Sequence, residues 1–212
     1  MTRFKILQSP EGLGLRDTYS RQKPLVIDFI RMERRLKQAG RRSELIVQAV
    51  RPRQGLKVMD CTAGLGTDAL ILAYLGCEVI LIERSQVVAG LLDDAIKRAK
   101  QHQTLADAAA RLHLVCAEAR SLLGVHPQQD VVYLDPMFPA KPGGALVRGR
   151  MQLLQKFVGP DHDSAELLDA VLASGVKRTV LKRPPKDSQW QPPRSPDNVL
   201  VSRNTKFEIY LQ

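Results

Sequence analysis

From Lys57 to Arg183 the chain alternates short apolar runs with longer segments in which apolar residues recur every three or four positions. The short runs end at charged residues or at glycine-containing turns, and they predict buried strands. These strands are expected at residues 57–61, 77–83, 111–117, 130–135 and 177–183. The periodic segments predict helices at residues 67–76, 86–100 and 164–174, the last with Ser164 as its N-cap. Because strands that alternate with helices form parallel sheets covered on both faces, we expect a doubly wound α/β fold.

The C-terminal end follows a different pattern. Residues 198–202 and 206–211 are two apolar runs separated by a short polar turn, which predicts an antiparallel hairpin at the edge of the sheet. A chain of 212 residues is long enough for one well-cored domain, so we expect a single structural domain.

The N-terminal end contains fewer regular signals. Residues 1–24 include scattered glycine and proline with few periodic apolar positions, and they are expected to be irregular or short-stranded. Apolar residues of helical period then predict a helix over residues 25–39 that ends at Gly40. A second helix is expected from Ser43, its cap, to Val50.

A glycine turn follows the first strand of the alternating region. Asp60 ends that strand, and Gly64 and Gly66 precede the next helix. Glycines let a ligand approach the backbone closely, and the start of a helix offers free N–H groups. Glu83 ends the following strand, where a carboxylate can accept both hydroxyls of a ribose. The pattern predicts a ligand that contains a nucleoside.

Two classes of nucleoside ligand fit this turn. Gly64, Gly66 and Ala69 satisfy a loose dinucleotide fingerprint, which favours an NAD-linked oxidoreductase. However, the glycines lie four residues beyond Asp60, and Asp68 puts negative charge where a pyrophosphate would dock. S-adenosylmethionine has no phosphate and carries a cationic sulfonium and ammonium, so we favour it as the ligand. A turn that only lets strand and helix pack is the remaining alternative.

The charge distribution indicates a polyanionic partner. The formal net charge is +10, and the basic residues cluster within residues 31–53, 141–158 and 177–194. We therefore expect the chain to bind nucleic acid. The residues expected to contact RNA phosphates are Arg34, Arg35, Arg41, Arg42, Lys141, Arg148, Lys182 and Arg183.

Other classes of protein are disfavoured. The three cysteines are widely spaced, without a nearby histidine pattern, so no metal site is expected. The longest apolar runs are too short to span a bilayer, and the start lacks the apolar core of a secretory signal. We expect a monomeric cytoplasmic protein that does not contact membranes.

The end of the fourth strand carries the remaining chemistry. The sequence "DPMF", Asp135 to Phe138, is similar to the (D/N)PP(Y/F) motif of methyltransferases that act on exocyclic amines of nucleic acid bases. An amine conjugated to a purine is a poor nucleophile, so the site has to orient it toward the methyl donor. We expect the Asp135 carboxylate and the Pro136 carbonyl to accept its N–H bonds and Phe138 to stack on the base. An Asp-Pro turn with Phe138 in the core is the structural alternative.

Several longer segments extend this similarity. The segments "DCTAGLGTDA", "GCEVILIERS", "LLDDAIKRA", "VVYLDPMFPAKPGGALV", "LLQKFVGPDHD", "KRTVLKRP" and "KFEIYL" resemble the small-subunit ribosomal RNA guanine-N2 methyltransferase family RsmJ (YhiQ) over residues 24–211. The resemblance implies a mostly parallel, seven-stranded class I (Rossmann-like) methyltransferase sheet ending in an antiparallel hairpin. Residues 1–52 would form a basic lead-in with helices packed on the core, and residues 53–212 the methyltransferase domain.

The resemblance also implies a reaction and a donor site. The reaction is methyl transfer from S-adenosylmethionine to the exocyclic N2 of one guanosine in 16S ribosomal RNA, with the RNA or the 30S particle as partner. The implied donor residues, beside Asp60, Gly64 and Gly66, are Thr67, Asp68, Glu83, Arg84, Glu118, Ala119 and Asp135. The chain departs from the family pattern at Thr67, where the family has arginine, and at Glu118 and Ala119, where it has serines.

Alternatives to this function remain open. The spacing of these motifs does not separate guanine N2 from adenine N6 or from a protein amine as the methyl acceptor. A nucleic acid binding module with a decayed enzyme site is a further reading. The intact set of Asp60, Gly64, Gly66, Glu83 and Asp135 disfavours it.

Overall fold

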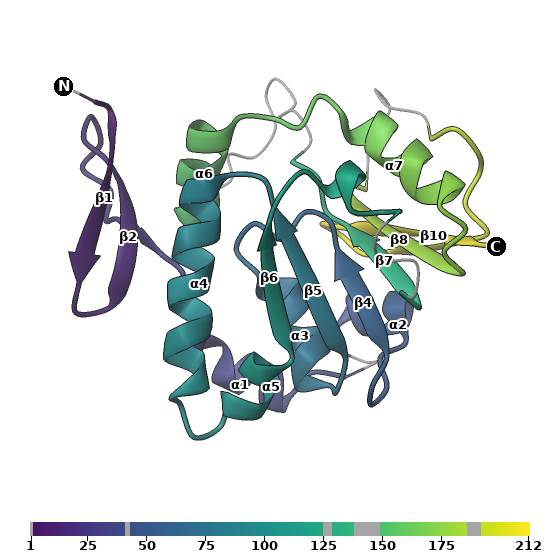
Figure 1. Ribbon diagram of the computed structural model, residues 1–212, viewed down its shortest axis with the longest axis horizontal. Coiled ribbons are helices and arrows are strands. Elements are labelled where there is room, and N and C mark those ends of the chain that lie inside the picture. Colours follow the sequence, from purple (N-terminus) through teal and green to yellow (C-terminus); the bar gives the residue numbers. More distant parts are fainter. Residues whose placement is uncertain (1, 41–42, 125–128, 138–148, 186–191) are drawn as a thin grey trace.

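A seven-stranded sheet forms the centre of the computed structural model, which describes residues 2–40, 43–124, 129–137, 149–185 and 192–212. The strand order is β6-β5-β4-β7-β8-β10-β9 (Figure 1). The strands are β4 (Lys57–Asp60), β5 (Glu78–Glu83), β6 (Leu112–Cys116), β7 (Val131–Leu134), β8 (Arg178–Arg183), β9 (Asn198–Val201) and β10 (Lys206–Leu211). Strands β4 to β8 run parallel, and β10 is antiparallel to both β8 and β9. The predicted fold class, including the closing hairpin, is confirmed.

Helices cover both faces of this sheet. One face packs against α2 (Leu45–Val50), α3 (Thr67–Tyr74), α4 (Gln86–Lys100) and α5 (Ala106–Ala110). The other packs mainly against α7 (Ser164–Ala173) and the 3-10 turn η2 (Ala119–Ser121). Successive residues of β4 face opposite sides of the sheet: Val58 belongs to the hydrophobic core on the first face, and Met59 to the core on the other. Strands buried on both faces read as continuous apolar runs, which is the pattern that predicted them.

A small antiparallel sheet precedes the main one, with strands β1 (Phe4–Ser9), β2 (Gly12–Asp17) and β3 (Leu25–Val26). The β1-β2 hairpin stands beside α4 (Figure 1). The backbone N–H of Leu13 donates to Asp94 Oδ2 of α4 at 3.0 Å. The Phe4 ring meets Phe157 of α6 (Arg150–Val158) edge to face, with centroids 5.1 Å apart. The expectation of short strands before residue 24 is therefore confirmed.

The helix predicted over residues 25–39 is wrong. Leu25 and Val26 pair with β2, and the chain then forms a 3-10 turn, η1 (Ile30–Met32), and one short helix, α1 (Glu33–Lys37). Asp28 Oδ1 accepts the Ile30 N–H at 3.1 Å, which shapes a turn before the helix. Val26, Phe29 and Leu36 are buried, whereas Ile30 is 39% exposed, and pairing with β2 outcompetes local helix propensity.

Both predicted serine caps are also wrong. The Ser43 hydroxyl accepts the Gly40 N–H and donates to the Gln38 carbonyl, so it stabilises the end of the preceding turn, and α2 begins two residues later. Ser164 is the first residue of α7, and its hydroxyl donates to the Asp161 carbonyl at 2.7 Å. Helices α5 and α6 were not predicted; α5 is a single turn of small residues without a clear period.

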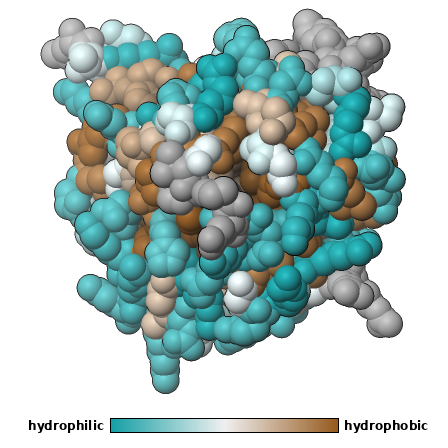
Figure 2. Space-filling model, turned by 45° about the vertical axis from the view of Figure 1, so that its right-hand side comes forward, coloured by the Kyte–Doolittle hydropathy of each residue, from teal (hydrophilic) through white to brown (hydrophobic). Residues whose placement is uncertain are grey.

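The surface of the molecule is mixed. Figure 2 shows apolar residues gathered in the middle of one face, with hydrophilic residues around them. Within the described segments, no helix has both the length and the apolar character that crossing a membrane requires.

Arg183 lies inside the protein. Its side chain is 2% exposed, and its Nη1 donates to both carboxylate oxygens of Glu208 on β10, at 3.1 and 3.2 Å. Glu208 also accepts from Lys206 Nζ at 2.7 Å and from the Tyr210 hydroxyl at 3.0 Å. The expectation that Arg183 contacts RNA phosphates is therefore corrected: its guanidinium is committed to fixing β8 against β10.

Glu208→Gln is expected to lower the free energy of unfolding by roughly 3 kcal/mol, because the buried guanidinium of Arg183 loses the carboxylate charge with which it pairs. Urea unfolding followed by circular dichroism measures this loss. The matched control is Glu166→Gln, which removes the partner of Arg120 at a side chain that is 69% exposed. The control should cost less than about 1 kcal/mol. Equal, small losses for both variants would contradict the structural role given to Arg183.

Candidate functional site

The glycine turn of residues 62–66 lies over the carboxyl ends of three neighbouring strands. The Cys61 N–H donates to the Tyr133 carbonyl of β7, and the Ala63 N–H donates to the Ile82 carbonyl of β5, each at 3.0 Å. Since β4 has β5 and β6 on one side and β7 and β8 on the other, the turn marks the point where the strand order reverses. Open α/β sheets bind their ligands at this point.

The two glycines of the turn have different tasks. Gly64 has a φ of +51°, and its N–H donates to Glu83 Oε2 at 3.0 Å. The other oxygen of Glu83 accepts the Ser85 N–H at 2.8 Å, so the carboxylate is held at the end of β5. Gly66 has a φ of +66°, and a Cβ there would come within 2.7 Å of Leu92 Cδ1. Gly64 thus shapes the ligand side of the turn, and Gly66 allows α3 and α4 to pack.

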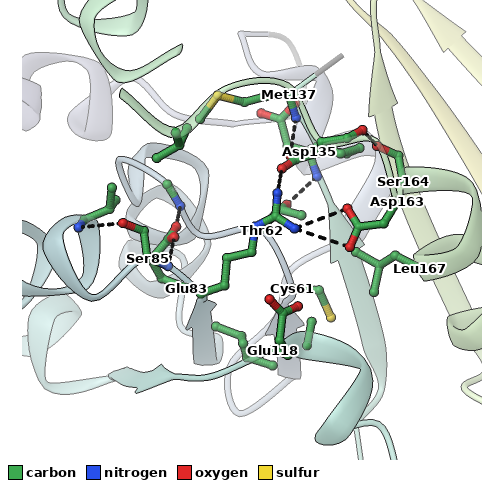
Figure 3. Close-up of a pocket in the computed structure, with 18 of the residues that line it drawn as sticks. Cys61, Thr62, Glu83, Ser85, Glu118, Asp135, Met137, Asp163, Ser164 and Leu167 are labelled. Atoms are coloured by element: carbon green, nitrogen blue, oxygen red, sulfur yellow. Dashed lines mark hydrogen bonds and ion pairs between the residues drawn. The ribbon is translucent and has the colours of Figure 1, made fainter. Parts of the chain in front are cut away.

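A cavity of about 370 Å³ opens next to Glu83 (Figure 3). Its wall combines polar groups with apolar side chains such as Ile82, Val88 and Leu167. Glu118, which is exposed, and Ala119, which is buried, also line it. We call this space the first cavity. Burial raises the pKa of Glu83, opposed by its two backbone hydrogen bonds.

Arg84 connects two parts of the wall of the first cavity. Its guanidinium pairs with Asp161 and with Asp163, the latter at 3.2 Å. Asp161 in turn holds the segment that follows β7: its Oδ2 accepts the Met137 N–H at 2.6 Å, and its own N–H donates to the Met137 carbonyl at 2.9 Å. The end of β5 is therefore coupled to the "DPMF" segment through Asp161.

A second cavity of about 410 Å³ lies on the other side of Asp135, Pro136 and Met137, which border both spaces. Its wall comes from elements far apart in the sequence. The lining side chains include Arg35, Asp60, Thr67, Asp68, Tyr133, Lys182, Asn204 and Thr205. The segment from Asp135 to Met137 thus forms the partition between the two cavities.

Three carboxylates and one ammonium meet at this partition. Lys182 Nζ donates to Asp68 Oδ2 at 2.8 Å and to Asp135 Oδ2 at 2.7 Å. The Tyr133 hydroxyl donates to Asp68 Oδ2 at 2.6 Å. Burial raises the pKa of Asp60 to about 8 and also raises the pKa of Asp135, where the charge of Lys182 opposes it. For Asp68, burial is outweighed by Lys182 and by hydrogen bonds, so its pKa lies below the usual value.

Most of the predicted donor residues come together around these two cavities. Glu83, Arg84, Glu118 and Ala119 line the first, Asp60, Gly66, Thr67 and Asp68 line the second, and Gly64, Asp135 and Pro136 border both. Arg34 is exposed on α1, whereas Arg35 forms a bidentate pair with Glu44 at 2.6 and 2.9 Å. Four predicted RNA contacts, Arg41, Arg42, Lys141 and Arg148, lie outside the described residues, as does Phe138.

Sequence reasoning missed several residues of the site. The Thr62 hydroxyl accepts the Asp135 N–H at 2.6 Å, and the Thr62 N–H donates to Asp60 Oδ1 at 3.0 Å. Tyr133 was read only as part of an apolar run, and Lys182 only as a basic surface residue. Asp161 lies in the segment "LLQKFVGPDHD", which was a usable signal for a role at the "DPMF" turn.

The residues around both cavities fit S-adenosylmethionine. A carboxylate fixed by backbone N–H groups, as in Glu83, suits a ribose diol, and the apolar walls of the first cavity suit an adenine ring. The acidic cluster at the partition suits a sulfonium and an ammonium better than a diphosphate. Among the described residues, no group of three or more histidine, cysteine, aspartate or glutamate side chains is placed to hold a metal ion.

Comparison with known proteins gives one consistent family. The family model described as "Putative SAM-dependent methyltransferase" matches residues 1–212. A protein of Aeromonas salmonicida named ribosomal RNA small subunit methyltransferase J is 40% identical over 98% of this chain and 86% of its own length. A relative of the same name from Thioalkalivibrio sulfidiphilus is also 40% identical, over 89% of this chain and 76% of its own length.

A solved structure supports the same conclusion. The crystal structure of a SAM-dependent methyltransferase from Neisseria gonorrhoeae matches with a TM-score of 0.75 and 31% identity, over 97% of this chain and 81% of that one. The chain therefore belongs to the family of S-adenosylmethionine-dependent methyltransferases whose members include the ribosomal RNA small subunit methyltransferases J, as its motifs predicted.

Proposed function

We propose that this enzyme transfers a methyl group from S-adenosylmethionine to the exocyclic N2 of a guanosine in 16S ribosomal RNA. The observation that carries the proposal is the position of Asp135. Its carboxylate stands on the partition between a cavity suited to the donor and a second cavity that opens beside it. A group on such a partition can touch an acceptor amine while the amine faces the donor.

The donor side is assigned to the first cavity. There Glu83 would accept the ribose hydroxyls, and the walls that include Ile82, Val88 and Ala119 would enclose the adenine ring. Glu118, which is exposed, is placed to accept the adenine amino group. When bound, S-adenosylmethionine supplies an electrophilic methyl group on a sulfonium. Residues of the protein orient the acceptor amine toward that methyl group.

The acceptor side is assigned to the partition and the second cavity. The Asp135 carboxylate and the Pro136 carbonyl would accept the two N–H bonds of the guanine amine, which directs the nitrogen lone pair toward the donor methyl. The Thr62 hydroxyl fixes the Asp135 backbone, and Asp161 fixes Met137 from the other side. This support keeps the accepting groups in place before the base arrives. Phe138 would stack on the base.

The RNA partner is proposed to be the small-subunit ribosomal RNA or the 30S particle, and the site of action is the cytoplasm. The net charge of +10 favours such a polyanion. Among the described basic residues, two are the proposed phosphate contacts: Arg34, which is exposed, and Arg35, which lines the second cavity. Arg41, Arg42, Lys141 and Arg148 remain proposed contacts by their sequence clusters. The enzyme is proposed to act as a monomer in which residues 1–52 pack on a methyltransferase domain of residues 53–212.

Asp135→Asn is expected to lower kcat for RNA methylation by about 100-fold or more, because the amide cannot accept a hydrogen bond at both of its polar atoms and carries no charge. Transfer of a labelled methyl group to 16S ribosomal RNA or 30S particles measures the rate, and calorimetry of S-adenosylmethionine binding separates the loss of turnover from any loss of donor affinity. The control is Asp169→Asn, at an exposed position on α7. Full turnover by the Asp135 variant would remove Asp135 from the mechanism.

Glu83→Gln is expected to weaken binding of S-adenosylmethionine by about 10-fold to 100-fold, since a charged acceptor of two hydroxyl hydrogen bonds is replaced by a neutral one. Isothermal titration calorimetry without RNA checks this directly. Glu78→Gln changes the other end of the same strand, where the side chain is 44% exposed, and should bind the donor normally. Unchanged affinity in the Glu83 variant would exclude the ribose role.

A further inference from the structure

Lys182 is placed by the sheet itself next to Asp135. Strands β7 and β8 are parallel neighbours, with Leu134 opposite Leu181, so the next residue of each strand lies at the same edge. There the ammonium of Lys182 reaches both Asp68 Oδ2 and Asp135 Oδ2, within 2.8 Å. Its side chain is only 26% exposed. A lysine expected to grip RNA is instead partly buried between two carboxylates.

Both contacts of Lys182 are held from other elements. Asp68 comes from the first turn of α3 and is fixed by the Tyr133 hydroxyl at 2.6 Å. Asp135 is fixed through its backbone N–H, which donates to the Thr62 hydroxyl. The ammonium therefore bridges two anchored carboxylates. Within the described part of the chain, the bonds of the Asp135 side chain involve Oδ2, which leaves Oδ1 for an incoming amine.

The charges of the neighbouring carboxylates affect the ionisation of Asp135. Asp60 is 2% exposed, and burial keeps it largely protonated near neutral pH. Asp68 and Asp135 then share one nearby ammonium, and like charges placed close together resist being ionised at the same time. The charged or titratable groups that act on Asp135 and its neighbours are Asp60 of β4, Asp68 of α3, Tyr133 of β7, Lys182 of β8, Arg35 of α1 and Asp161 before α7.

We propose that Lys182 is a positioning residue, whose ammonium keeps Asp135 ionised and turns its free oxygen toward the acceptor amine. The inference rests on the proposed function, in which Asp135 accepts an N–H of the base. The proposed role of Lys182 is exerted through Asp135, although its side chain also lines the second cavity. Without its charge, Asp135 is a partly buried acid beside a second acid, and a protonated Asp135 presents a weaker hydrogen-bond acceptor to the amine.

The direction of the pH effect follows from these charges. Activity that needs ionised Asp135 is lost as the pH falls through its pKa. Lys182→Met removes the cation that lowers this pKa, so the acidic limb of the kcat profile moves to higher pH. Asp68→Asn removes the carboxylate that raises it, so the limb moves to lower pH. Opposite shifts from neighbouring substitutions are not expected from general loss of packing.

The test measures kcat against pH for methylation of 16S ribosomal RNA or 30S particles at saturating donor and RNA. Lys182→Met should lower kcat at pH 7 by about 100-fold and recover part of it at higher pH, and Lys182→Arg should keep the acidic limb near its normal position. Lys177→Met, an exposed position just before β8, is the matched control and should behave as the unmodified enzyme. Asp68→Asn provides the opposite shift, and it keeps the test decisive if Lys182→Met does not fold.

The proposal is overturned if the acidic limb of Lys182→Met stays in place, with or without a lower kcat. If Lys182→Met cannot be measured, an unshifted acidic limb in Asp68→Asn overturns it. The proposed function is tested separately in the same assay by the unmodified enzyme. If that enzyme forms no methylated guanosine, the proposed function fails. If it does, the comparison among the variants decides the role of Lys182.

Discussion

The site depends on the burial of several acids around a single ammonium at the carboxyl edge of the sheet. Asp60, Asp68 and Asp135 come from β4, α3 and the end of β7, and Lys182 of β8 lies between the last two. Isolated buried carboxylates are costly, so such a group persists only with protonation, hydrogen bonds or a cation. The structure supplies all three: burial favours protonated Asp60, Tyr133 and Thr62 donate hydrogen bonds, and Lys182 supplies the charge.

The same edge links donor and acceptor binding. The glycine turn joins β5 to β7 through backbone hydrogen bonds, and Glu83 closes it from the β5 side. Arg84, the next residue, pairs with Asp161, which holds the Met137 backbone in two directions. The segment that would receive the base is therefore anchored to the strand end that would receive the ribose. A short, rigid connection of this kind suits a reaction that depends on alignment of a nucleophile with a methyl group.

Sequence patterns predicted the sheet because its strands are buried on both faces and read as continuous apolar runs. They failed at residues 25–39, where apolar spacing suited a helix but Leu25 and Val26 pair with β2. Pairing between distant segments leaves no local signal. The backbone position of Asp135 was predictable from the strand end, whereas the partners of Asp68 were not. Asp68 has the cation of Lys182, which comes from a strand more than 100 residues later.

Charge clusters were a less specific guide than strand ends. Lys182 and Arg183 belong to one basic run. Because successive side chains of β8 point to opposite faces of the sheet, Lys182 pairs with Asp135 and Arg183 with Glu208. A basic run in a buried strand thus does not by itself indicate an RNA surface. The glycine turn was more informative, because Gly64 and Gly66 both have positive φ, a conformation that few other residues adopt.

The most direct test of the central claim, that Asp135 presents a guanine amine to the donor, is mass spectrometry of nucleosides from 16S ribosomal RNA of a strain that lacks this gene. The account predicts the loss of one N2-methylguanosine, restored by the intact gene and not by a gene carrying Asp135→Ala. An unchanged nucleoside profile, the loss of a different methylated nucleoside such as N6-methyladenosine, or restoration by the Asp135 variant would contradict it.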